Sequence, residues 1–179
     1  MFDLNKYLGT WYELAHYPSW FQRNDNYNTR AEYSLNKDGS MAIVNSTINR
    51  GTPVASYGKA TKLRDRSFKV EFSNEEATRL QTSPGFQTGP VQGWESQTPG
   101  QEWKKTLSRG PSFSNYVVDK IWYDAQGRYL FAVVTDDAKE SMWVLSRFKN
   151  PSLGQYNQVI KYVTDNYDRN KLVQTPHFE

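Results

Sequence analysis

Few residues in this chain have the type and spacing that catalysis needs. The chain has no cysteine, which excludes thiolate catalysis, disulfides and cysteine-ligated metals. Its two histidines, His16 and His177, are far apart, and no His, Asp or Glu cluster has metal-ligand spacing. Serine, aspartate and histidine are present, but nothing in the sequence arranges them as a catalytic triad. We therefore expect no catalytic residues, no metal and no cofactor, with an enzyme kept as an alternative.

The aromatic and aliphatic residues have a spacing that favours binding by burial. Aromatic residues make up 15% of the 179 residues. Phe68, Val70 and Phe72 alternate with Lys69 and Glu71, which is the period of a strand with one buried face. Large flat side chains on such strands line the interiors of barrels and sandwiches.

Eight short segments have strand character, and most of them are joined by turns of hairpin length. They are residues 9–17, 29–35, 40–49, 54–63, 67–72, 115–123, 128–135 and 141–147. This pattern is typical of an all-β up-and-down barrel or a sandwich. A barrel of eight strands encloses a space that holds one small ligand.

One strong helix follows these strands. Ser152 and Gln155 have the spacing of a capping box at its start. Helical spacing places six apolar or aromatic residues on one face: Leu153, Tyr156, Val159, Ile160, Val163 and Tyr167. We expect this face to pack on the outside of the sheet, before a short final strand at 171–175.

The segment 73–112 has little periodicity and interrupts the strand pattern. It holds nine of the 19 Gly and Pro residues of the chain. A loop of this length in a compact domain is usually functional or disordered. It also carries three aromatic residues, Phe86, Trp94 and Trp103, and is therefore less polar than a plain linker.

Charge and hydropathy bear on partners and location. The formal net charge is +3, and no run of five basic residues is present, so nucleic acid is not an expected partner. A mild positive charge is more often a solubility feature than a binding one, but it also suits an anionic lipid head group or a fatty carboxylate. No apolar run approaches 18 residues, and residues 1–7 lack a signal-like apolar stretch. These features favour a cytoplasmic or membrane-peripheral location and leave a mature periplasmic or secreted form open.

Four segments together resemble the lipocalin family. They read YLGTWYELA at 7–15, TRAEYSLN with DG at 29–39, MWVLSR at 142–147, and YD with KLVQT at 167–175. The resemblance is to the group of bacterial lipocalins, plant temperature-induced lipocalins and apolipoprotein D. It covers roughly residues 2–72 and 113–176. The chain departs from that group in lacking cysteine, in a weak middle motif at 122–124, and in the long segment between strands five and six.

The resemblance implies one domain over 1–179, with an inserted loop at about 73–112. Its fold would be an eight-stranded antiparallel up-and-down barrel, or calyx, with a C-terminal α-helix packed outside. Gly9, Trp11 and Arg147 match the family's signature residues. Gly9 would allow a tight turn, Trp11 would plug the barrel floor, and the Arg147 guanidinium would lie over the indole.

The resemblance also implies which side chains line the cup. These ligand-binding candidates are Ala31, Tyr33, Met41, Ile43, Asn45, Phe68, Val70, Phe72, Tyr116, Val118, Trp143 and Leu145. The alternative is a solid interior filled by the same side chains. Tyr33, Asn45 and Tyr116 are the polar members, and buried polar groups need partners. They are candidates to orient a ligand head group or a water molecule.

The mouth of the barrel is expected to carry five aromatic residues. Trp20 and Phe21 lie on the loop after the first strand, where they would gate the entrance, touch a membrane, or simply anchor the loop. Phe86, Trp94 and Trp103 lie in the inserted loop, which would form a lid over the cup or have no role in binding.

The resemblance implies a protein that carries or scavenges a small hydrophobic or amphipathic ligand in the cup. A fatty acid or lysophospholipid is the expected partner, and stress or membrane-lipid protection the expected context. Two alternatives stay open. One is a lipid- or pigment-modifying enzyme, an isomerase or de-epoxidase, on the same barrel. The other is a module that binds a membrane or a protein through its mouth loops.

Overall fold

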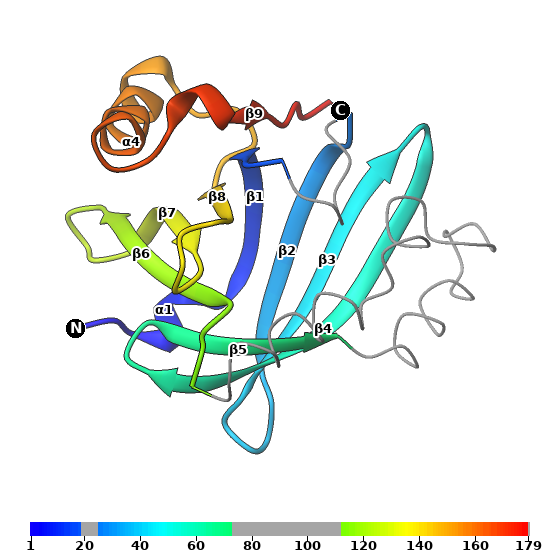
Figure 1. Cartoon of the computed structure of the whole chain (residues 1–179), viewed down its shortest axis with the longest axis vertical. Coiled ribbons are helices and arrows are strands. Elements are labelled where there is room, and N and C mark those ends of the chain that lie inside the picture. The colour runs from blue at the N-terminus through cyan, green and yellow to red at the C-terminus, as the bar shows by residue number, and fades with distance from the viewer. Residues whose placement is uncertain (19–24, 73–111, 179) are drawn as a thin grey trace.

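The computed structural model describes residues 1–18, 25–72 and 112–178. Figure 1 shows strands that curve into a barrel, with one longer helix set against its outside. The elements follow in the order α1 (Leu4–Tyr7), β1 (Gly9–His16), β2 (Tyr27–Leu35), β3 (Met41–Asn49), β4 (Thr52–Arg64), β5 (Ser67–Phe72), β6 (Tyr116–Tyr123), β7 (Tyr129–Thr135), β8 (Met142–Ser146), α4 (Leu153–Asn166), the 3-10 helix η1 (Arg169–Lys171) and β9 (Val173–Gln174).

Strands β1 to β8 form a closed antiparallel barrel. Each strand pairs with the next along the chain, and β8 returns to pair with β1, which closes the sheet. The short β9 adds to β1 at Ala15 and His16. The barrel with a C-terminal helix is therefore confirmed, and the sandwich that the strand pattern left open is excluded.

The strand boundaries differ from the predicted ones by at most two residues. β4 is longer than expected because its pairing with β3 runs unbroken from Met41 opposite Ala60 to Asn49 opposite Thr52. The turn between them uses Arg50 and Gly51, both with positive φ. This long hairpin supplies one wall of the barrel interior.

A bulge in β1 places two consecutive residues in the cluster that packs against the helix outside the barrel. The register shifts between Glu13 and Ala15, and both Leu14 and Ala15 then join the cluster outside the barrel. Val159 and Val163 of α4 are fully buried in that cluster. The cluster also takes in Phe131 and Val133 of β7 and Met142 and Val144 of β8.

The start of α4 confirms one prediction and corrects another. Ser152 and Gln155 form the expected capping box. Leu153, expected on the packed face, is 75% exposed. A face inferred from periodicity assumes contact along the whole helix, whereas the two fully buried side chains, Val159 and Val163, lie nearly two and nearly three turns further on. Tyr162 takes part in the packing instead, edge-on to Trp122 with ring centres 5.6 Å apart.

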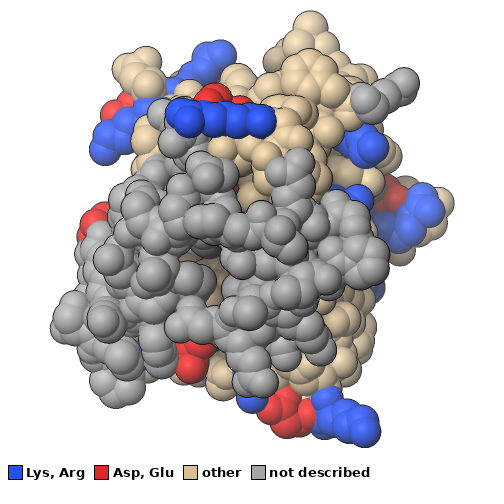
Figure 2. Space-filling view, turned by 90° about the vertical axis from the view of Figure 1, so that its right-hand side faces the viewer, with Lys and Arg blue, Asp and Glu red and all other residues tan. Residues whose placement is uncertain are grey.

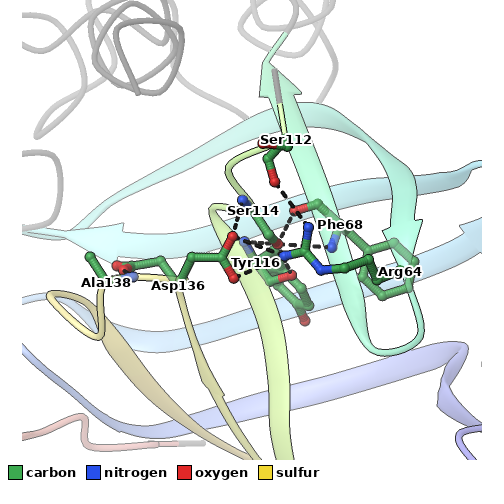
Figure 3. Close-up of polar contacts among 8 residues, drawn as sticks. Arg64, Phe68, Ser112, Ser114, Tyr116, Asp136 and Ala138 are labelled. Carbon is green, nitrogen blue, oxygen red and sulfur yellow. Dashed lines mark hydrogen bonds and ion pairs between the residues drawn. The ribbon is translucent and has the colours of Figure 1, made fainter. Parts of the chain in front are cut away.

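The contact between β5 and β6 is short and is completed by side chains. The two strands share only two residue pairs, at Ser67 and Phe68. Beyond them, the buried Ser114 hydroxyl accepts from the Phe68 amide at 3.0 Å and donates to the Phe68 carbonyl at 2.6 Å (Figure 3). In the same way, the side-chain amide of Asn115 accepts from the Val70 backbone N–H at 2.7 Å and donates to the Val70 carbonyl at 3.0 Å.

An ion pair on the outer surface supports the short contact between β5 and β6. Arg64 contacts the Asp137 carboxylate at 2.9 Å and donates to the Ser112 carbonyl at 3.0 Å. Asp137 also accepts from the Ser114 amide at 2.6 Å. Ser112, Ser114 and Arg64 therefore join the entry to β6 with the end of β4, as Figure 3 shows. We call this set of contacts the β5–β6 junction.

Candidate functional site

Trp11 closes one end of the barrel. Its ring is fully buried, and its indole N–H donates to the Tyr7 carbonyl at 2.7 Å. The Arg147 guanidinium lies 3.9 Å from the centre of that ring. It also donates to the carbonyls of Lys6, Leu8 and Thr10 at 2.8–2.9 Å.

Gly9 is required by this arrangement for two reasons. Its φ of 105° is one that other residues rarely adopt. A Cβ at this position would also lie 3.2 Å from Arg147 Nη1. Glycine therefore lets β1 begin directly against the guanidinium.

Above this floor the barrel contains an open cavity. The empty space between its walls and at its mouth, open solvent included, is about 900 Å³. Nine of the twelve residues expected in the cup line it: Ala31, Tyr33, Ile43, Asn45, Val70, Phe72, Tyr116, Trp143 and Leu145. The alternating strand positions thus identify most of the wall, and contact with a ligand stays a prediction for each residue.

The other three expected residues, Met41, Phe68 and Val118, are buried below the cavity. They belong to the core cluster that also includes Phe2, Tyr7 and Trp11. Each points into the barrel, but the interior at their level is filled. The solid-core alternative therefore describes the closed part of this barrel, and the cup describes the open part.

Three tyrosine hydroxyls meet between these two parts. Tyr116 donates to Tyr33 at 2.6 Å, and the Tyr7 hydroxyl lies 2.6 Å from that of Tyr116. The Tyr7 and Tyr33 rings stack with centres 5.3 Å apart. We call Tyr7, Tyr33 and Tyr116 the tyrosine triad.

Burial keeps the triad in its neutral form. It raises the pKa of Tyr33 to about 12, and it raises the pKa values of Tyr7 and Tyr116 well above their ordinary value. Proximity among the three rings adds to the effect on Tyr7 and Tyr116. The triad therefore acts through O–H donors and oxygen acceptors at neutral pH.

The wall nearer the mouth carries polar residues that the sequence reasoning missed. Glu13 is 4% exposed, lines the cavity, and accepts from the Thr175 hydroxyl at 2.6 Å. Thr29 and Thr47, whose hydroxyls lie 2.6 Å apart, also line the cavity. A period-two count from Trp11 would have found Glu13, and the same count from Asn45 would have found Thr47.

Two further polar atoms sit near this wall. Ser56 lies opposite Asn45 in the β3–β4 pair and is 1% exposed. Within the described part of the chain, its hydroxyl and Asn49 Oδ1 have no hydrogen-bond partner. The other amide atom of Asn49, Nδ2, donates to Asn26 at 2.8 Å.

The mouth residues expected from the sequence, Trp20, Phe21, Phe86, Trp94 and Trp103, lie outside the described residues. Phe72 directly precedes the longer undescribed segment, Asn115 lies three residues after the described chain resumes at Ser112, and both Phe72 and Asn115 line the cavity. The chain therefore leaves β5 and approaches β6 at the cavity wall.

Neither histidine is among the residues that line the cavity. His16 Nδ1 lies 2.8 Å from the Tyr17 carbonyl, and His177 Nε2 lies 2.6 Å from the Glu13 carbonyl. Among residues 1–18, 25–72 and 112–178, no three His, Cys, Asp or Glu side chains are grouped so as to hold a metal.

In Figure 2, both acidic and basic side chains of the described residues appear around the edges of the face drawn. As for membrane spans, no helix within the described ranges is both long and apolar enough to cross a bilayer.

Comparison with known proteins agrees with this architecture. The model of the lipocalin-like domain matches residues 2–86. Temperature-induced lipocalin-1 of Arabidopsis thaliana is 27% identical over 175 residues, covering 97% of this chain and 78% of the relative. Outer membrane lipoprotein Blc of Vibrio cholerae is 27% identical over 173 residues, covering 96% and 81%.

Solved structures support the same fold. The cockroach allergen Per a 4 superimposes with a TM-score of 0.61 at 13% identity, covering 99% of this chain and 89% of the allergen. At this identity the match concerns the fold alone.

Proposed function

This chain is a member of the lipocalin family, which binds small hydrophobic ligands, and we propose that it carries or scavenges one such molecule in its barrel cavity. The observation that carries this proposal is a cavity with a closed floor and apolar walls. Ile43, Val70, Phe72, Trp143 and Leu145 are among its apolar lining residues.

The physical basis of the proposed binding is removal of hydrocarbon from water. Each buried methylene contributes about 0.8 kcal/mol. Roughly fifteen buried carbons of an acyl chain then supply about 12 kcal/mol, of which about 4 kcal/mol offsets the freedom lost on association. The remaining energy of about 8 kcal/mol corresponds to a Kd of about 1 μM. An acyl chain in the cavity therefore binds usefully without any strong polar contact.

We propose a fatty acid or a lysophospholipid as the ligand. Either has one apolar chain to lie against the walls and one polar head. The polar side chains nearer the mouth, such as Asn45 and Asn115, are suited to a head group that stays close to water. The name of one relative, temperature-induced lipocalin, supports a context of temperature stress, and we propose membrane-lipid protection as the role in that context.

We propose carriage rather than catalysis. Lipocalin relatives are generally binding and transport proteins. In this chain neither His16 nor His177 is among the residues that line the cavity, so neither is placed as a general base toward it.

Two measurements test the proposal. Mass spectrometry of an organic extract of the purified protein should find a lipid in stoichiometric amount. Titration of delipidated protein with hexadecanoic acid should change the tryptophan emission, and the variant Trp143→Phe should lose most of that change because Trp143 lines the cavity. An empty extract together with an unchanged emission spectrum would overturn the proposal.

A further inference from the structure

The inner end of the cavity is polar, although an acyl chain would bring a methyl group there. Tyr33 and Tyr116 both line the cavity and are 5% and 9% exposed. Their hydroxyls are bonded to each other at 2.6 Å, above the filled core of Met41, Phe68 and Val118. A molecule that fills the cavity therefore ends against phenol oxygens.

In the two hydrogen bonds of the triad, the hydroxyl proton of Tyr33 is not donated to either of the other tyrosines. Tyr116 has a single hydroxyl proton and donates it to Tyr33. Tyr7, which lies 2.6 Å from Tyr116, must then be the donor in that pair. Neither bond uses the Tyr33 proton, and Tyr33 faces the cavity.

The other end of the cavity is polar as well. Thr29 lines it four residues before Tyr33 on β2, which is about 13 Å along the strand. Glu13, Asn45 and Asn115 also line it. Along β2, Ala31 separates Thr29 from Tyr33, while on β3 Asn45 lies opposite Ala31 and Ile43 lies opposite Tyr33.

We infer that the ligand is an elongated apolar molecule with an oxygen function at each end, and that Tyr33 donates a hydrogen bond to the end that enters first. This inference rests on the proposed carrier function and narrows its ligand class. The inner group would be a hydroxyl, carbonyl or ether oxygen. A purely apolar cup would disfavour such a group, because an unpaired buried hydroxyl is costly. The triad reverses that preference.

The test compares two acids of equal chain length by calorimetry: hexadecanoic acid and 16-hydroxyhexadecanoic acid. We expect the delipidated protein to bind the hydroxy acid at least as tightly as hexadecanoic acid. In Tyr33→Phe, affinity for the hydroxy acid should fall about five- to tenfold, while affinity for hexadecanoic acid is unchanged or higher.

Tyr7→Phe is the matched control. It removes a hydroxyl from the same triad, but Tyr7 is fully buried behind the cavity wall. We expect it to keep the ratio of the two affinities within about twofold of that of the unaltered chain. If removing a triad hydroxyl only destabilises the fold, stability falls but the affinity ratio does not change. Tyr7→Phe shows this structural effect alone, and the change in ratio expected of Tyr33→Phe is then due to contact with the ligand.

Three results would overturn the inference. One is tenfold or greater preference of the unaltered protein for hexadecanoic acid. Another is an affinity ratio that Tyr33→Phe leaves unchanged; in that case both acids bind and the carrier proposal stands. The last is an equal loss for both acids in Tyr33→Phe, which would place the carboxylate at the triad. If neither acid binds, the carrier proposal fails together with this inference.

Discussion

The Arg147 guanidinium lies 3.9 Å from the centre of the Trp11 ring and bonds to the carbonyl of Thr10, the residue before it. One side chain thus covers the plug of the barrel and holds the strand that carries it. The two residues are 136 positions apart, so the contact joins the first strand to the end of the last barrel strand.

Replacing Arg147 by alanine should destabilise the protein by about 2–4 kcal/mol, since it removes a ring contact and three charge-assisted hydrogen bonds. Urea unfolding measures this change. Arg128→Ala is the control, because Arg128 pairs with Asp124 on an exposed turn and should cost less than about 1 kcal/mol. Equal effects of the two substitutions would contradict the assigned role of Arg147.

Ser114→Ala should weaken the β5–β6 junction. It leaves the amide and the carbonyl of Phe68 without the hydroxyl that bonds both, at a cost of about 2–4 kcal/mol. Hydrogen exchange of the Phe68 amide should speed up accordingly. Ser112→Ala is the control, because Ser112 contacts Arg64 through its backbone carbonyl and keeps that bond. Unchanged exchange at Phe68 in Ser114→Ala would show that the junction does not depend on the hydroxyl.

The free energy of unfolding at alkaline pH should report the burial of the tyrosine triad. The pKa of Tyr33 is raised to about 12 in the folded chain, against an ordinary value of 10. As pH rises, the unfolded chain therefore loses the Tyr33 proton before the folded chain does. The contribution of Tyr33 to the free energy of unfolding is fully present below pH 10 and is lost between about pH 10 and pH 12. Unfolding free energies across this range should fall less steeply for Tyr33→Phe than for the unaltered chain.

Tyr162, with a pKa raised to about 12 by burial and the Asp119 carboxylate, contributes to the same window in both proteins. The difference between the two curves therefore removes the Tyr162 contribution and reports Tyr33 together with its effect on the pKa values of Tyr7 and Tyr116. Parallel curves would contradict its burial as a neutral phenol.

The sequence allowed the barrel, the outside helix and most of the cavity wall to be predicted, because the period of two fixes which strand residues point inward. It did not show where along the barrel the cavity ends. Met41, Phe68 and Val118 point inward like the lining residues, but Tyr7 fills the space beside them. Tyr7 precedes β1 on a one-turn helix, so no strand period predicts where its ring lies. The exposure of Leu153 has a similar origin, since helix periodicity gives a face but not the extent of its contact.

The central claim is that the barrel cavity holds one hydrophobic ligand. Calorimetric titration of the delipidated chain with hexadecanoic acid, beside Ala31→Trp, tests it most directly. Ala31 lines the cavity and is 6% exposed, so an indole there should occupy the ligand's space. Leu145→Trp provides a second blocking variant if the first does not fold.

The account predicts binding of one molecule per chain with a negative heat-capacity change, and at least tenfold weaker binding to a folded blocking variant. Undiminished binding to that variant, or no binding to the unaltered chain, would contradict it.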